Sequence, residues 1–260
     1  MFEFSQGSIP LSQLDRNVLN YLNVHVGQMP GFDAFIVLSS GTHLLKMTPM
    51  VLLLWGFWFI RDGNEAHRRS DVLLTILGSF ASIAISRALS LLLPFRVRPM
   101  YNADLALQIP ATMEHGVLET WSSLPSDHAA MAFALATGIF LLHRAFGILA
   151  LLHATFVICL PRLYLSLHYP SDILLGALVG IVTATMVMRV APIQGLASSL
   201  LTFERARPAI FYILFFLISS QMVEMFDGSR HLAHFLLRST SLSLAAATDR
   251  PLLLGDAFTP

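Results

Sequence analysis

Six long apolar stretches constrain the fold of this chain more than any other feature. They cover approximately residues 35–60, 72–93, 126–142, 145–160, 173–190 and 209–225. One crossing of a bilayer needs roughly 20 such residues, and each stretch is too long and too free of alternation for a buried strand. A segment exposed to lipid must satisfy its own backbone hydrogen bonds, so helices are expected. The sequence therefore predicts an all-α polytopic membrane protein with about six transmembrane helices.

The composition supports this interpretation. Hydrophobic residues make up 55% of the chain and charged residues only 12%, whereas a soluble domain carries about a quarter charged residues. An ordinary cytosolic enzyme and a disordered chain are therefore excluded. The 16 basic and 16 acidic residues balance, so no nucleic-acid partner is expected. The single cysteine, Cys159, excludes a disulfide framework and a metal site built from several cysteines.

Both ends of the chain are expected to lie outside the membrane core. Residues 11–26 place apolar and polar side chains on opposite sides of a helix, with Leu11, Leu14, Val18 and Leu22 on one side and Gln13, Asp15, Arg16 and Asn20 on the other. This pattern predicts an amphipathic helix on the membrane surface, after which Pro30-Gly31 would turn the chain into the first span. We expect an N-terminal surface segment over 1–34, a six-helix membrane domain over 35–225 and a C-terminal surface tail over 226–260.

The basic residues near the span ends bear on the orientation in the membrane. Seven arginines fall on each side: Arg61, Arg68, Arg69, Arg144, Arg189, Arg205 and Arg207 on one, and Arg16, Arg96, Arg98, Arg162, Arg230, Arg238 and Arg250 on the other. If Arg96, Arg98 and Arg162 belong to a functional site, seven remain against four. The first side is then cytoplasmic, and the site faces the extracytoplasmic side.

Charged residues gather in three short clusters, which counting spans places on one face of the membrane. The first is Arg96-Val97-Arg98-Pro99, after the second stretch. The second is Pro125-Ser126-Asp127-His128, at the start of the third stretch. The third consists of Arg162, His168 and Asp172, between the fourth and fifth stretches. Ionisable groups at membrane depth are costly, so they tend to be paired and functional.

The residue types in these clusters suit phosphoryl transfer. Arginine side chains bind phosphate oxygens, and Ser126 begins a helix whose free backbone N–H groups favour an anion. His168 and His128 offer a nucleophile and a general acid. Asp172 lies four residues after His168 and could hold one of its ring nitrogens. The pattern predicts transfer through a phosphohistidine, with arginines and helix N-termini neutralising charge where other enzymes use a metal.

The clusters resemble the motifs of the type 2 phosphatidic-acid phosphatase superfamily, which are Lys-x6-Arg-Pro, Pro-Ser-Gly-His and Ser-Arg-x5-His-x3-Asp. Matching residues are Arg98-Pro99, then Pro125-Ser126-Asp127-His128, then Arg162, His168 and Asp172, all within about residues 91–175. The resemblance implies the helical bundle of that superfamily. It also implies His168 as nucleophile, His128 as acid on the leaving group and Asp172 as the residue that orients His168. Phosphate would be bound by Arg98, Ser126 and Arg162.

Two positions depart from the superfamily pattern. The motif lysine falls at Leu91, which cannot contact phosphate, so Arg96 takes its place in the expected phosphate-binding set, which also includes Asp127. The motif serine is Pro161, which removes one hydroxyl donor. An Arg-x-Arg-Pro motif followed by Pro-Ser-Asp-His resembles the undecaprenyl-diphosphate phosphatase branch, as does a surface helix before the first span.

The resemblance to this branch implies a lipid phosphatase in a bacterial inner membrane, with an isoprenyl diphosphate such as undecaprenyl diphosphate as the preferred substrate. Phosphatidic acid, phosphatidylglycerol phosphate and lipid A phosphates stay open as substrates, as does phosphotransfer to a lipid hydroxyl in place of water. The alternative from another class is a lipid transporter that uses the basic cluster only for binding. Half-helices and inverted repeats typical of transporters are not evident in the sequence. No cofactor is expected, and the oligomeric state is left open.

Several polar residues lie outside the three clusters. Lys46, the only lysine, is interpreted as a helix packing contact in preference to a residue lining the substrate groove. Arg87 lies three turns before Arg98, and nothing in the sequence decides its role. In the long loop over 94–125, Glu114, His115 and Glu119 fit no strong ligand motif, so no metal is expected.

Overall fold

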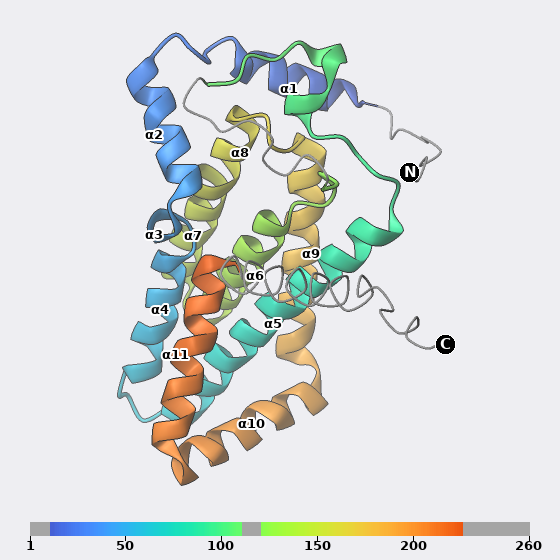
Figure 1. Ribbon diagram of the computed structural model, residues 1–260. Coiled ribbons are helices and arrows are strands. Elements are labelled where there is room, and N and C mark those ends of the chain that lie inside the picture. Colours follow the sequence, from blue (N-terminus) through green and yellow to red (C-terminus); the bar gives the residue numbers. More distant parts are fainter. Residues whose placement is uncertain (1–10, 111–120, 226–260) are drawn as a thin grey trace, which may run out of the picture.

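The computed structural model describes residues 11–110 and 121–225, which form a bundle of helices (Figure 1). Within those ranges the chain forms helices and no strands, which confirms the prediction of an all-α protein. The predicted C-terminal tail over 226–260 lies outside the described residues, as do Glu114, His115 and Glu119.

The apolar helices follow the order of the predicted stretches. Three are long and apolar enough to cross a membrane: α5 (Glu65–Leu92), the continuous segment Arg144–Tyr164 and α9 (Pro170–Arg189). Three shorter apolar helices are α4 (Thr48–Phe59), α6 (Asp127–Leu142) and α11 (Pro208–Glu224). Large apolar side chains such as Leu178 on α9 and Phe216 on α11 are exposed, as expected for helices that face lipid. The chain is thus built as an integral membrane protein, and the count of six crossings stays a prediction.

The first predicted stretch is not one helix. It is divided into α2 (Pro30–Gly41), α3 (His43–Lys46) and α4. Thr42 is extended and Pro49 lies in the first turn of α4, where its missing N–H is tolerated, whereas it would interrupt a continuous helix. The break places Lys46 at the end of α3, where its side chain is buried. Its carbonyl contacts His153 Nε2 at 2.8 Å.

The segment Arg144–Tyr164, which leads to the third motif, is also not a uniform α-helix. It consists of α7 (Arg144–His153), a π-helical segment over Ala154–Cys159, and α8 (Leu160–Tyr164). Pro161 sits at the start of α8 and cannot donate the backbone hydrogen bond of a regular helix. Such local π-helices are frequent at functional sites, and this one ends three residues before Arg162.

Close packing of α6 against α9 brings two of the three motifs together. Gly176 and Gly180 of α9 face the backbone of α6 so closely that an added Cβ would lie 2.4 Å from the Ser126 oxygen and 2.2 Å from the Ala130 oxygen. Only glycine permits this approach, because any side chain would collide with backbone atoms. The N-termini of the two helices are also joined by a hydrogen bond from the Ser126 N–H to the Asp172 carbonyl, 3.1 Å long.

The third and fourth predicted stretches form the antiparallel pair that their short connection implies. Only His143 separates α6 from α7. Gly147 lies against Phe140, where an added Cβ would be 2.1 Å from the Phe140 Cα. The hairpin places α7 and α8 beside α6, so that the third motif returns to the end of the bundle where α6 begins.

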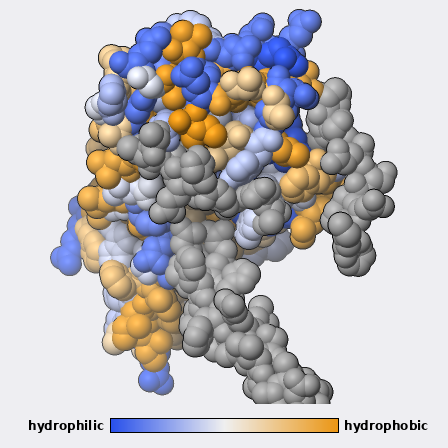
Figure 2. All heavy atoms as spheres, turned by 45° about the horizontal axis from the view of Figure 1, so that its top comes forward, coloured by the Kyte–Doolittle hydropathy of each residue, from blue (hydrophilic) through white to orange (hydrophobic). Residues whose placement is uncertain are grey.

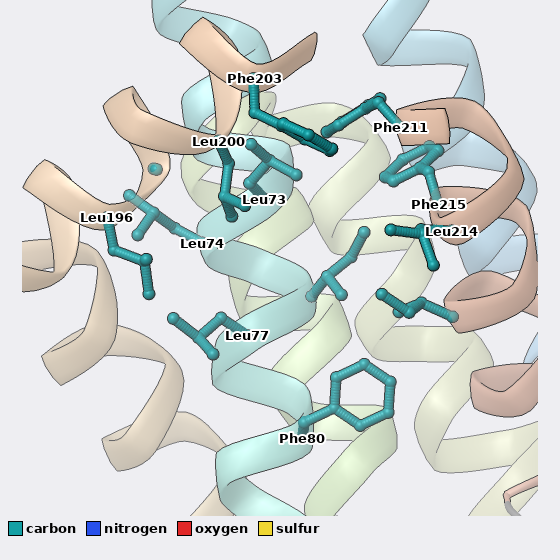
Figure 3. Close-up of a pocket in the computed structure, with 13 residues that line it drawn as sticks. Leu73, Leu74, Leu77, Phe80, Leu196, Leu200, Phe203, Phe211, Leu214 and Phe215 are labelled. Atoms are coloured by element: carbon teal, nitrogen blue, oxygen red, sulfur yellow. The ribbon is translucent and has the colours of Figure 1, made fainter. Parts of the chain in front are cut away.

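At the opposite end lies a helix that the apolar pattern did not predict, α10 (Ala191–Ala206). It runs across the lower end of the bundle in Figure 1. Between α5, α10 and α11 is an apolar pocket (Figure 3), lined by Leu73, Leu74, Ile76, Leu77, Phe80, Leu196, Ala197, Leu200, Phe203, Phe211, Leu214, Phe215 and Ile218. Its lining has no charged or hydrogen-bonding side chain, so it is not suited to phosphate.

The N-terminal helix α1 (Gln13–Asn23) lies over the other end of the bundle, close to α8 and the start of α9 (Figure 1). The helix was predicted, but Asp15, which the prediction placed on its polar side, is buried against the bundle. Asp15 and Leu19 are buried, whereas Leu14 is 53% exposed. Leu19 packs with Leu105 and Tyr169. Asp15 can be buried because it pairs with Arg96, in the connection after α5, and with Ser171 at the start of α9. Figure 2 shows hydrophilic residues concentrated at this end of the molecule.

Candidate active site

The three motifs predicted to share one face of the membrane meet beneath α1. Arg98 lies in the connection after α5, just before the short 3-10 helix Pro99–Tyr101. Ser126 precedes α6 and His128 lies in its first turn. Arg162 lies in α8, His168 follows it, and Asp172 lies in the first turn of α9. Direct contacts between side chains and main-chain atoms join all three motifs.

His168 is held through its Nδ1 atom. That nitrogen lies 2.9 Å from the Ser123 carbonyl oxygen and 3.7 Å from Asp172 Oδ2. Since a carbonyl can only accept, Nδ1 carries the proton in the neutral ring and the lone pair is on Nε2. Sequence reasoning assigned the orienting role to Asp172 and missed Ser123, because a main-chain carbonyl leaves no signal in the sequence.

Burial lowers the pKa of His168 below its usual range, and the positive charges of Arg98 and Arg162 act in the same direction. A hydrogen bond and the charge of Asp172 oppose this shift. The net direction favours the neutral imidazole at pH 7, and the neutral ring is the form that can act as a nucleophile.

Positive side chains surround the two histidines. Arg98 Nη1 lies 3.3 Å from His168 Nε2 and also donates to the Leu167 carbonyl at 2.8 Å. His128 has Arg162, Lys46, His168 and Arg98 as its electrostatic neighbours. The sequence favoured a packing role for Lys46; its side chain is buried, and it is also one of the cations near His128. Leu91, where the motif lysine falls, is 86% exposed.

Ser126 contributes a hydroxyl that has no partner among the described residues. It occupies the N-cap position of α6, but its side chain makes no capping hydrogen bond. Its Oγ atom is buried without a hydrogen-bond partner in the part of the chain that the structure describes. A buried hydroxyl that is left unpaired is costly, so this donor is available to a bound anion at the helix N-terminus.

Arg96 has a different set of neighbours from the other arginines of the motifs. Its Nη1 donates to Asp172 Oδ1 and Ser171 Oγ, and its Nη2 donates to Asp15 Oδ2 at 2.7 Å. The guanidinium also lies 4.0 Å from the centre of the Tyr169 ring. Both terminal nitrogens are thus engaged with protein groups, and Arg96 reaches the cluster through Asp172.

Asp127, the second residue added to the expected phosphate-binding set, pairs with α5. Its carboxylate accepts a hydrogen bond of 2.7 Å from Ser86 and forms an ion pair with Arg87. The Arg87 guanidinium lies 4.3 Å from the centre of the Trp121 ring. Asp127 is thus engaged with two side chains of α5, and its expected role in phosphate binding stays a prediction.

The bundle of apolar helices carries two histidines and several buried cations at one end, together with a helix-start hydroxyl that has no partner among the described residues. This arrangement suits phosphoryl transfer in a membrane-embedded protein. Comparisons with known proteins agree with that class. Residues 80–195 match the family model described as the PAP2 superfamily. The putative undecaprenyl-diphosphatase YbjG of Escherichia coli (strain K12) is 30% identical over 174 residues, which cover 66% of this chain and 80% of YbjG. The chain belongs to the PAP2 superfamily and is a membrane lipid phosphatase of that superfamily.

Two further similarities cover different extents of the chain. The bacitracin transport permease protein BcrC of Bacillus licheniformis is 39% identical over 71 residues, which are 27% of this chain and 34% of BcrC. This match therefore spans about a third of the length of that relative. The crystal structure of Aquifex aeolicus LpxE aligns with a TM-score of 0.49 and 24% identity, covering 67% of this chain and 94% of LpxE.

Proposed function

We propose that this chain removes phosphate from an isoprenyl diphosphate such as undecaprenyl diphosphate, through a phosphohistidine on His168. The observation that carries the proposal is the placement of His168. Its Nδ1 is fixed by the Ser123 carbonyl, and its Nε2 lies beside Arg98. The similarity to YbjG, whose name specifies an undecaprenyl-diphosphatase, supports this substrate.

In the first step, His168 Nε2 attacks the terminal phosphorus. A nitrogen–phosphorus bond forms, the bond from phosphorus to the bridging oxygen breaks, and His128 gives its proton to the departing oxygen. In the second step, His128 takes a proton from water, the oxygen of that water attacks phosphorus, and the nitrogen–phosphorus bond breaks. Inorganic phosphate leaves, and both histidines return to their starting forms.

Positive groups lower the barrier because negative charge builds up on the equatorial oxygens. Arg98 and Arg162 lie close to His168, and Lys46 and Arg162 lie close to His128. The Ser126 hydroxyl and the N-terminus of α6 add donors on the same side. With Leu91 turned outward, we assign the task of the motif lysine to Lys46 in preference to Arg96.

The test is phosphate release by the purified full-length chain in detergent, with chelator present. The panel contains undecaprenyl diphosphate, phosphatidic acid, phosphatidylglycerol phosphate and lipid A. We expect vanadate-sensitive release, fastest from the diphosphate, and a loss of at least about 1,000-fold in His168→Ala, because the nucleophile is removed. His67→Ala is the matched control, since His67 lies at the start of α5, at the other end of the bundle, and is largely exposed.

Other outcomes would favour the alternatives. Faster phosphate release from a monophosphate than from the diphosphate would show that the monophosphate is the preferred substrate. Release that appears only when a lipid alcohol is added, with the phosphate transferred to it, would indicate a phosphotransferase. Binding of diphosphate by folded wild-type protein without any release would overturn the enzyme assignment and favour a transporter, the class of protein that the name of BcrC specifies.

A further inference from the structure

A chain of buried charges runs from α1 to the carboxylate beside His168. The side chain of Asp15 is 1% exposed, that of Arg96 is 6% exposed and that of Asp172 is fully buried. Arg96 bridges the two carboxylates, donating to Asp15 Oδ2 through Nη2 and to Asp172 Oδ1 through Nη1. Buried charges are tolerated only when they are paired and hydrogen-bonded, so each member depends on the others.

Asp15 is also fixed to the start of α9. Its Oδ1 accepts the Ser171 N–H at 2.9 Å, and its Oδ2 accepts the Ser171 hydroxyl at 2.8 Å. Although burial alone would raise the pKa of Asp15, the hydrogen bonds from Ser171 and Arg96 hold it below its usual range. Asp15 is therefore a permanent negative charge at neutral pH, placed against α9.

Arg96 connects to His168 by two routes. Through its side chain it holds Asp172, whose other oxygen, Oδ2, lies 3.7 Å from His168 Nδ1. Through its main chain it holds Ser123: the Ser123 N–H donates to the Arg96 carbonyl at 2.9 Å, and the Ser123 carbonyl then accepts from His168 Nδ1 at 2.9 Å. Both groups that contact Nδ1 are thus anchored on the same arginine.

We propose that Asp15 is a positioning residue of the phosphatase site, which acts through Arg96 on the two groups that hold His168. The surface helix α1 is then part of the active site. This inference rests on the proposed function for the role of His168. It goes beyond that function by giving Arg96 an orienting task in place of phosphate binding, and by adding a residue from outside the three motifs.

The charge arrangement predicts opposite effects of removing each partner. The groups that face His168 are Asp172 from α9, Arg98 from the first motif, Arg162 from α8 and His128 from α6. In Asp15→Asn, Arg96 is no longer shared, so it neutralises Asp172 more fully and the pKa of His168 falls. In Arg96→Gln, Asp172 loses its counter-charge and the pKa of His168 rises.

The experiment combines kinetics with NMR titration of the full-length chain in detergent. The signal of His168 is followed in histidine-labelled protein and assigned with His168→Gln. We expect kcat to fall about tenfold in Asp15→Asn with KM nearly unchanged, because positioning errors reduce the rate of the chemical step. The acidic limb of the pH–rate profile and the midpoint of the His168 titration should both shift to lower pH in Asp15→Asn. Both should shift to higher pH in Arg96→Gln. Arg96→Lys keeps the charge and should titrate like the wild type.

Asp33→Asn is the matched control for loosening the N-terminal segment. Asp33 is a buried carboxylate on α2 that accepts from Tyr164 Oη and from the Gly27 N–H, and neither of these partners belongs to the chain of charges around Arg96. We expect lower thermal stability without movement of the His168 titration.

The inference and the proposed function fail in different ways. Unchanged His168 titration in both Asp15→Asn and Arg96→Gln, or a rise in KM without a fall in kcat, would overturn the positioning role even if the wild type releases phosphate. No release by the wild type together with opposite shifts in titration would overturn the proposed function and support the coupling from α1.

Discussion

At the scale of residues, the resemblance to the superfamily motifs did not identify which side chain stands in for the motif lysine. The superfamily motif supplies a lysine that this chain lacks, and Leu91 at that position is 86% exposed. Lys46 comes from α3, far before Leu91 in the sequence, yet it is a neighbour of His128. We therefore propose that α3, through Lys46, supplies the positive charge that the motif lysine would bring.

The assignment of Lys46 can be tested by substitution. We expect Lys46→Met to lower kcat/KM by about tenfold or more, since a donor to a charged group contributes about 1.5–3 kcal/mol. Lys46→Arg should restore most of the activity because it keeps the charge. Equal activity in Lys46→Met and wild type, measured by phosphate release, would return Lys46 to a packing role.

Ser126 makes a second prediction at this scale. Its Oγ atom has no hydrogen-bond partner among the described residues, so Ser126→Ala removes no bond to those residues from the free protein. We expect the thermal midpoint to stay the same and kcat/KM to fall about 10-fold, from the loss of one hydrogen bond to a charged phosphate. A lower midpoint with unchanged kinetics would contradict a role in binding. Ser199→Ala, on α10 and outside the site, is the control.

At the scale of elements, the site depends on the contact between α6 and α9. Their N-termini carry His128 and Asp172, and glycines on α9 permit the two backbones to approach. The glycines lie within an apolar stretch, and their positions in the sequence do not indicate which helix they contact. Only the packing shows that Gly176 and Gly180 face Ser126 and Ala130.

We expect Gly180→Ala to destabilise the protein by about 1–3 kcal/mol, the usual cost of overpacking, because the new Cβ would lie 2.2 Å from the Ala130 oxygen. Activity should fall with stability, since α9 must move away from α6. Thermal unfolding in detergent measures the effect. Gly56→Ala on α4 is the control, because its Cβ would meet nothing within 4 Å; similar losses in both variants would refute the packing argument.

For the whole molecule, the arginine distribution predicts which end faces which side of the membrane. The site and α1 lie at one end, and the start of α5 with α10 lies at the other (Figure 1). The only cysteine, Cys159, is buried, so single introduced cysteines can be labelled selectively. Asp104 is exposed near the site end and Asn64 is exposed at the opposite end.

We expect Asp104→Cys to react with a membrane-impermeant maleimide added from the extracytoplasmic side of expressing bacterial cells. Asn64→Cys should react only after the membrane is disrupted, because the arginines near that end favour the cytoplasm. Labelling in the reverse order would contradict the proposed orientation. Phosphate release before and after labelling of each variant shows whether the protein stays folded.

The sequence by itself determined the helical membrane architecture and the meeting of the three motifs at one end. Both follow from features that are local in the chain: long apolar stretches favour helices in a membrane, and motifs at the ends of successive stretches are expected to share a face. The sequence did not determine the breaks that divide the first predicted stretch into α2, α3 and α4, or the helix α10.

Only the tertiary structure decided which groups pair. Asp15 meets Arg96 across 81 positions of sequence and Ser171 across 156, and Ser123 meets His168 through a main-chain atom. The helical pattern of α1 predicted that Asp15 lies on the polar side and faces water, because a charged carboxylate is normally exposed to solvent. In the structure Asp15 is buried, because its partner Arg96 carries the opposite charge and hydrogen-bonds to it. A buried charge is tolerated when it is paired in this way.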